Sequence, residues 1–141
     1  MSKRKFKLGL DLHGVANALP KFFSKLTKVL IQSGFEVHII TGKHIRDGVK
    51  EELKNNKISY THIFSIADYH ESIGTKMNYD ENNEPWISRK KWNGAKGKYC
   101  KKNKIDIHID DSDIYNKHFK TPYAQVFINL KKEKNGKCKK K

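Results

Sequence analysis

The chain has 141 residues, of which 36% are hydrophobic and 11% aromatic, and it carries a formal net charge of +15. This length and apolar content favour one compact domain over a disordered chain, and two cysteines do not indicate a disulfide framework. Neither an apolar run long enough to span a bilayer nor a secretory signal is present, so we expect a cytoplasmic protein without a membrane partner.

The positive charge is concentrated in three segments. Residues 1–7 carry +4, residues 89–104 carry +8 and residues 131–141 carry +6, which leaves about −3 for the rest of the chain. Only three of the 30 basic residues are Arg, the residue preferred for bidentate phosphate contacts. Charge alone therefore leaves open both a nucleic-acid-binding surface and a compositional bias. We expect residues 1–5 and 131–141 to be solvated basic tails.

The first half of the chain alternates short apolar strands with amphipathic helices. Strands are predicted at 6–10, 35–40 and 60–66, and helices are predicted at 19–33 and 45–56. Because strands that alternate with helices form parallel sheets covered on both faces, this order predicts an α/β domain.

The alternation breaks at about residues 68–93, which we predict to be a small insert with a turn between two short strands in 75–87. The alternation then resumes with a helix, a strand, a helical turn and a last strand, at 94–103, 105–109, 112–119 and 124–130. The predicted domain therefore covers residues 6–130.

Polar residues stand where three of the predicted strands end. Asp11 follows the first strand, Thr41 follows the second, and Asp110 and Asp111 follow the strand at 105–109. Carboxylates buried together cost free energy unless they are paired or bind a cation. Their oxygens suit Mg²⁺, a hard ion that bridges to phosphate, and Thr41 and a lysine would then hold the phosphate oxygens.

Three segments resemble motifs of the haloacid dehalogenase (HAD) superfamily. Residues 8–15 (LGLDLHGV) resemble its first motif, residues 39–42 (IITG) its second, and residues 107–112 (IHIDDS) its fourth. Lys96 fits the third motif best, and Lys98 is the alternative. The Asp-Asp-Ser ending of the fourth segment is similar to that of the 5'(3')-deoxyribonucleotidase branch.

The resemblance implies a Rossmann-like core with about five parallel strands in the order 3-2-1-4-5. It also implies an Mg²⁺-dependent phosphatase in which Asp11 is the nucleophile and forms an aspartyl-phosphate. Mg²⁺ would be held by Asp11, the main-chain carbonyl of His13 and Asp110, with Asp111 supporting this group.

Phosphate binding is the second task that the resemblance assigns. Thr41, Gly42 and the third-motif lysine, Lys96 or Lys98, would neutralise and orient the phosphoryl oxygens.

His13 departs from the family pattern, which has a second Asp at this position. In phosphatases of the family that Asp protonates the leaving group and then activates water. An imidazole changes protonation near neutral pH and can do the same work. Alternatively, its presence slows turnover, leaves a long-lived acyl-phosphate, or marks a domain that binds phosphate or nucleic acid without catalysis.

Substrate choice in this family resides in cap insertions, and the insert at 68–93 is the candidate here. A nearly uncapped site admits bulky phosphates, and the basic segment 89–104 attracts anions. We therefore expect a nucleotide or a nucleic-acid terminal phosphate as substrate, with non-specific nucleic-acid contact through the basic tails and residues 89–104. Trp86 and Trp92 either pack the insert onto the body or offer a surface for a base. His108 is expected to be structural, and no role is assigned to the histidines without ligand spacing, at 38, 44, 62, 70 and 118.

Overall fold

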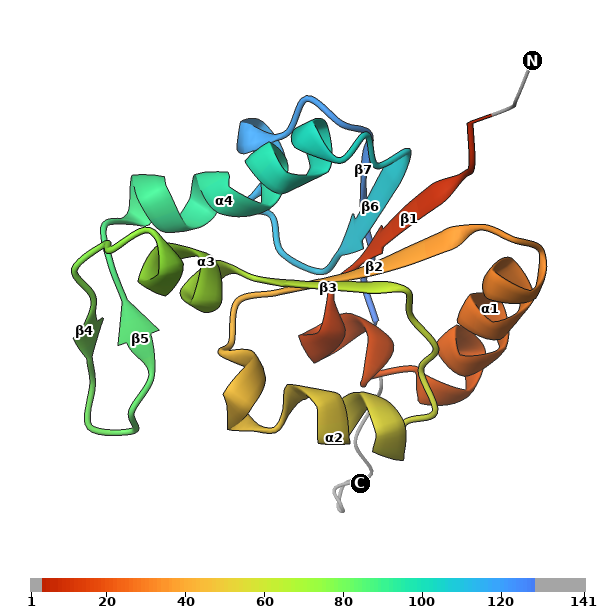
Figure 1. Ribbon diagram of the computed structural model, residues 1–141, viewed down its shortest axis with the longest axis horizontal. Helices are drawn as coiled ribbons and strands as arrows, with labels where there is room; N and C mark the ends of the chain where they lie inside the picture. Colours follow the sequence, from red (N-terminus) through yellow and green to blue (C-terminus); the bar gives the residue numbers. More distant parts are fainter. Residues whose placement is uncertain (1–3, 129–141) are drawn as a thin grey trace, which may run out of the picture.

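The computed structural model describes residues 4–128, in which strands and helices alternate along most of the chain (Figure 1). The main strands are β1 (Lys7–Leu10), β2 (Glu36–Thr41), β3 (His62–Ser65), β6 (Ile107–Asp110) and β7 (Tyr123–Gln125). The α-helices are α1 (Pro20–Gln32), α2 (Val49–Asn55), α3 (Ile66–Ser72) and α4 (Arg89–Lys102). Shorter elements are the helical turns η1 (Leu12–Ala16), η2 (Ile45–Asp47) and η3 (Asn116–His118) and the strands β4 (Asn78–Tyr79) and β5 (Pro85–Trp86).

The five main strands form one parallel sheet in the order β3-β2-β1-β6-β7. Leu10 of β1 pairs with Ile39 of β2 on one side and with Ile109 of β6 on the other. β1 is therefore central, and the carboxyl ends of β1, β2 and β6 meet at one edge. The predicted α/β class is confirmed: a five-stranded parallel sheet is flanked by helices, consistent with a Rossmann-like architecture.

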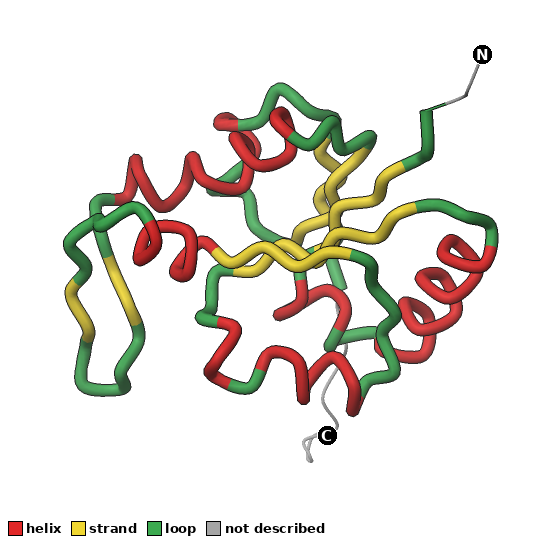
Figure 2. The backbone as a smooth tube through the Cα atoms, in the orientation of Figure 1, coloured by secondary structure: helices red, strands yellow, loops and turns green. Residues whose placement is uncertain are grey.

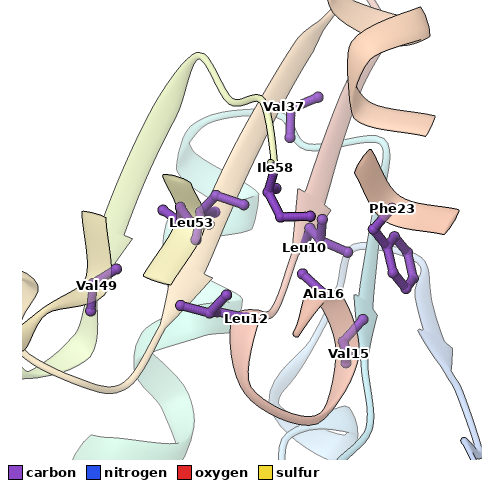
Figure 3. Close-up of a cluster of buried hydrophobic side chains, with 10 residues drawn as sticks. Leu10, Leu12, Val15, Ala16, Phe23, Val37, Val49, Leu53 and Ile58 are labelled. Carbon is purple, nitrogen blue, oxygen red and sulfur yellow. The ribbon is translucent and has the colours of Figure 1, made fainter. Parts of the chain in front are cut away.

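Two apolar layers hold the helices on the sheet, with α1 and α2 on one side and α4 on the other (Figure 1). In the larger layer, side chains from β1, β2, η1, α1 and α2 converge, as Figure 3 shows for Leu10, Leu12, Val15, Ala16, Phe23, Val37, Val49, Leu53 and Ile58. Under α4, Ile40 packs with Cys100 and Ile105. Each large apolar side chain buried in this way stabilises the fold by about 1.5–3 kcal/mol, so the strand ends are held on a rigid frame.

Two predicted helix boundaries are wrong, and local backbone chemistry explains both. The helix predicted over 45–56 is interrupted at Gly48, whose φ of +89° separates η2 from α2. The helix predicted from residue 94 begins at Arg89, because the Ser88 hydroxyl caps it by accepting a hydrogen bond from the Lys91 N–H. α4 has a glycine at position 97 because a side chain does not fit there: a Cβ would lie only 2.4 Å from the His118 carbonyl oxygen.

The region predicted as an insert, about 68–93, contains most of α3 and an antiparallel hairpin of β4 and β5 (Figure 2). α3 begins at Ile66, so the strand predicted over 60–66 ends one residue earlier, at Ser65. The hairpin confirms the predicted turn between two short strands in 75–87, whereas residues 89–93 belong to α4. β7 ends at Gln125, earlier than the predicted strand end at residue 130, which lies outside the described residues.

The N-terminal basic segment is partly tied to the domain. The Arg4 guanidinium pairs with the Asp106 carboxylate and donates to the Lys104 carbonyl at 3.0 Å. The predicted tail at residues 1–5 therefore includes a residue with specific contacts, and the predicted tail at 131–141 lies outside the described residues. Among residues 4–128, no helix has the length and apolarity needed to cross a bilayer.

Candidate active site

Three strand ends line one pocket at the carboxyl edge of the sheet. Asp11 follows β1, Thr41 ends β2 and Asp110 ends β6, and the Asp11 N–H donates to the Ile109 carbonyl at 3.0 Å. The pocket has a volume of about 440 Å³. Its lining comes from strand ends, loops, α4 and the hairpin, and comprises Asp11, His13, Thr41, Gly42, Lys43, Glu84, Pro85, Trp92, Lys96, Asp110, Asp111, Ser112 and Tyr115.

Lys96, which lies on α4, bridges two of these strand ends. Its Nζ donates to Asp11 Oδ1 at 3.1 Å and to Asp110 Oδ2 at 2.8 Å, and the side chain is only 2% exposed. The ammonium group also lies 4.5 Å from the centre of the Tyr115 ring, a cation–π contact. Because two carboxylates and an aromatic ring hold the buried ammonium group, it is a fixed positive charge in the floor of the pocket.

Asp110 is the most heavily hydrogen-bonded carboxylate of the group. Besides Lys96, its Oδ2 lies 2.9 Å from His108 Nε2, and its Oδ1 accepts the Ser112 N–H at 3.1 Å. His108, for which we expect a structural role, thus contacts Asp110 from within the same strand.

The electrostatics of the two buried acids differ. Burial raises the pKa of Asp11 to about 7, an effect that the Lys96 ammonium opposes and the Asp110 carboxylate reinforces. Burial also acts against ionisation of Asp110, but hydrogen bonds from His108 and Lys96 outweigh it and hold the pKa of Asp110 well below its usual range. Burial lowers the pKa of Lys96, but the Asp11 and Asp110 carboxylates outweigh it and raise the pKa above its ordinary value. The pocket thus carries more negative charge than Lys96 alone compensates.

Asp111 completes an oxygen-only group. One carboxylate oxygen each from Asp11, Asp110 and Asp111 lie within 4.8 Å of one another. Gly14 lies in close contact with Asp111, since a Cβ on Gly14 would lie 2.2 Å from Asp111 Oδ2. The φ of Gly14 is +83°, a conformation that favours glycine. These three carboxylates are the residues of the pocket that could hold a cation, since hard divalent ions take oxygen ligands.

His13 lines the pocket and is oriented by an acid from α2. Its Nε2 lies 2.9 Å from Glu52 Oε1, and Asn17 Nδ2 donates to Glu52 Oε2 at 2.9 Å. Burial alone would raise the pKa of Glu52, but the hydrogen bonds from Asn17 and His13 hold it below its ordinary value. The His13 imidazole is thus paired with an ionised carboxylate, the arrangement used to orient a general acid or base.

The segment after β2 forms another wall of the pocket. Thr41 is fully buried, and its Oγ1 lies 3.4 Å from the Lys43 N–H. A Cβ on Gly42 would come within 2.9 Å of the Trp92 ring, so the indole of α4 packs directly on this segment. Of the two tryptophans, Trp92 therefore packs against the body, whereas Trp86 on the hairpin is 54% exposed.

Lys98, the alternative to Lys96 for phosphate binding, does not line this pocket. Lys98 is exposed and lines a different pocket with Phe64 and Tyr69. Two residues along an α-helix turn the side chain by about 200°, so Lys96 and Lys98 point to opposite sides of α4.

Sequence reasoning missed Lys43 and Tyr115, which line the pocket, and Glu52, which contacts His13 from outside the lining. Lys43 directly follows the segment at 39–42, so its place in the chain was a usable signal. Glu52 carries no such signal, since it lies 39 residues from His13 and reaches it only through the packing of α2. Tyr115 likewise reaches Lys96 only through the loop after β6.

Comparisons with protein-family models, with curated proteins and with solved structures find no match to this chain. The chemistry assigned to the pocket therefore rests on its own residues and their geometry.

Proposed function

We propose that this protein is an Mg²⁺-dependent phosphomonoester hydrolase of the HAD type that acts through an aspartyl-phosphate on Asp11. The observation that carries the proposal is the buried bridge from Lys96 to Asp11 and Asp110, at 3.1 and 2.8 Å, in a pocket that also holds Thr41 and His13. A nucleophilic carboxylate and a hydroxyl at adjoining strand ends, with a fixed ammonium group from α4 on the carboxylate, suit in-line phosphoryl transfer.

The oxygen donors fit the metal that the proposal requires. Asp11, Asp110 and Asp111, together with the main-chain carbonyl of His13, would hold Mg²⁺. When bound, the ion neutralises charge on the phosphoryl group.

The proposed reaction has two steps. A carboxylate oxygen of Asp11 attacks phosphorus while the bond to the leaving oxygen breaks, and the His13 imidazolium gives that oxygen a proton. Water then attacks phosphorus of the aspartyl-phosphate, His13 takes the proton of the water, and Asp11 and inorganic phosphate are released. Lys96, Thr41 and the backbone of Gly42 orient the phosphoryl oxygens throughout.

The surroundings of the pocket favour a nucleotide or a nucleic-acid terminal phosphate as substrate. The short β4–β5 hairpin contributes Glu84 and Pro85 to the pocket lining. Because this hairpin is a small cover, a bulky phosphate ester can enter. The amino-terminal part of α4 supplies Trp92 to the pocket wall and carries basic residues on the same segment, which attract a polyanion.

One residue favours a second function, the binding of phosphate or nucleic acid without turnover. His13 occupies the position of an acid in the family motif, and its bond to Glu52 holds the imidazole toward α2. In that alternative the basic surface would carry the activity of the protein.

The test is a phosphatase assay on p-nitrophenyl phosphate, nucleoside monophosphates and oligonucleotides phosphorylated at the 5' or the 3' end. We expect turnover that needs Mg²⁺, is abolished by EDTA and falls at least about 1,000-fold in Asp11→Asn. Asp113→Asn, which changes an exposed acid outside the pocket, is the matched control.

His13→Asp separates the two functions. If His13 is the working acid and base, the variant loses activity, and a gain would show that the histidine weakens catalysis. Absence of wild-type turnover on every ester, with nucleic-acid binding unchanged in Asp11→Asn, would reject the phosphatase in favour of the binding function.

A further inference from the structure

A second group of polar side chains lies at the opposite end of β2 from the acidic pocket. Glu36 and His38 project from one face of β2, because alternate residues of a strand share a face. His62 of β3 is the register partner of His38, and the two rings stack with centroids 4.1 Å apart and an interplanar angle of 5°. Strand pairing therefore brings the His62 imidazole, which is distant in the sequence, to His38 and Glu36.

The donor atoms of this group converge. His38 Nε2 lies 2.8 Å from Glu36 Oε1, and His62 Nδ1 lies 3.9 Å from the same oxygen. One donor atom from each of the three residues lies within 4.8 Å of the other two. Because the two stacked rings are parallel and His62 Nδ1 lies 2.9 Å from Thr61 Oγ1, ligation of one ion by both imidazoles requires the His62 ring to turn. The His62 side chain is 49% exposed, which leaves room for that turn.

The buried imidazole is already held as a metal-ligating histidine is held. His38 Nδ1 lies 2.7 Å from the Tyr99 hydroxyl of α4, which leaves Nε2 as the nitrogen that faces Glu36. Metal-binding histidines generally use their second nitrogen for a hydrogen bond that fixes the ring. The group at His44 is held in a similar way, by Asp68 and Tyr79, but it offers a single imidazole beside two carboxylates, Asp68 and Glu71.

We propose that Glu36, His38 and His62 form a Zn²⁺ site with three protein ligands and one position open to water. Two imidazole nitrogens and one carboxylate are a known donor set for Zn²⁺ and are a poor one for Mg²⁺. The bound ion joins β2 to β3, the edge strand of the sheet, and so stabilises that edge. The site is independent of the proposed phosphatase pocket, with which it shares no residue.

One neighbouring charge opposes the ion. Lys7 Nζ lies 3.8 Å from Glu36 Oε1, and it also donates to the Asn103 carbonyl at 3.1 Å. Removal of this ammonium group takes a positive charge away from the Zn²⁺ position, so Lys7→Gln should bind the ion more tightly.

The test uses Co²⁺, which has visible absorption bands and replaces Zn²⁺, titrated into the full chain with excess Mg²⁺ to saturate the acidic pocket. We expect tetrahedral-type Co²⁺ bands that Zn²⁺ abolishes, at least ten-fold weaker binding in His62→Ala, and about three-fold tighter binding in Lys7→Gln. Zn²⁺ should raise the melting temperature of the wild type and leave that of His62→Ala unchanged.

Two control variants should bind Co²⁺ as the wild type does. Asp11→Asn alters the acidic pocket, and Glu71→Gln alters the group around His44. Equal Co²⁺ binding by His62→Ala and wild type would overturn the proposal, as would loss of binding in Asp11→Asn. A thiolate-to-cobalt charge-transfer band would assign the ion to a cysteine, and binding weaker than about 1 mM in the wild type would also reject the site.

Discussion

The two ends of β2 hold side-chain groups of opposite character. At the carboxyl end, Asp11 and Asp110 are buried around a lysine, and with Asp111 they offer oxygen donors. At the amino end, His38 and His62 offer nitrogen donors beside a single carboxylate, and His62 reaches solvent.

Under the two proposals, one sheet holds two cations of different kind, each selected by its donor atoms. The acidic pocket compensates its charge internally through Lys96 and leaves an excess that suits a hard ion. The histidine group needs no buried cation, because imidazoles are neutral ligands, and it suits a softer ion such as Zn²⁺. Changes at the acidic pocket should therefore leave the histidine group intact, and the predictions below test that independence.

The largest effect is expected from Lys96→Met, which leaves Asp11 and Asp110 buried without their cation. Removal of one partner of a buried ion pair usually costs about 3–5 kcal/mol. We expect the free energy of unfolding in urea to fall by about 3 kcal/mol, the lower end of this range. The loss is limited because Asp11, whose pKa is already raised, takes up a proton when the lysine is absent. Phosphatase activity should fall at least about 100-fold.

Co²⁺ binding at the histidine group provides the control for this variant. Binding should be unchanged at temperatures where the variant is folded. Wild-type stability in Lys96→Met would show that the acidic pocket does not depend on its internal cation, and the contrast between the two ends would be lost.

Gly14→Ala should be the next most damaging change. Its φ of +83° is unfavourable for alanine, and the new Cβ would lie 2.2 Å from Asp111 Oδ2. Gly34→Ala is the matched control, since Gly34 has a φ of +87° and nothing within 4 Å of a Cβ. We expect a loss of about 1 kcal/mol for Gly34→Ala from backbone strain alone, and about 2–3 kcal/mol for Gly14→Ala.

Phosphatase activity should also distinguish Gly14→Ala from Gly34→Ala. Gly14→Ala displaces Asp111 and should lower activity about ten-fold, whereas Gly34→Ala should leave it unchanged. Equal unfolding free energies for the two variants would mean that the loop is not crowded against Asp111.

The smallest effect is expected from Glu52→Gln, which keeps the shape of the side chain but removes the charge that faces His13. Because Glu52 positions the imidazole, we expect kcat to fall about ten-fold and the pH profile of kcat to shift, with little change in KM. Glu51→Gln, on the exposed side of α2, is the control and should match wild type. An unaltered pH profile in Glu52→Gln would assign Glu52 a purely structural role.

Much of the fold and part of the pocket followed from the sequence, for a common reason. The strands are short apolar runs that stop at a polar residue, so Asp11, Thr41 and Asp110 could be located at strand ends before any geometry was known. Parallel strands with helical crossovers then bring such ends to one edge.

The remainder depends on contacts that sequence spacing does not encode. The choice between Lys96 and Lys98 needed the rotation of α4, whose start was misplaced because the Ser88 cap was not recognised. The pairing of His13 with Glu52 depends on how α2 packs. The histidine group was missed because only the register of β2 and β3 joins residues 38 and 62.

The positions of the two tryptophans allow intrinsic fluorescence to report on the pocket. Trp92 packs on Gly42 in the pocket wall, whereas Trp86 stands exposed on the hairpin. The chain has no other indole, so emission from a Trp86→Phe protein arises from the pocket alone. Fluorescence of that single-tryptophan protein would follow occupancy of the pocket in real time, with unlabelled ligands and without turnover.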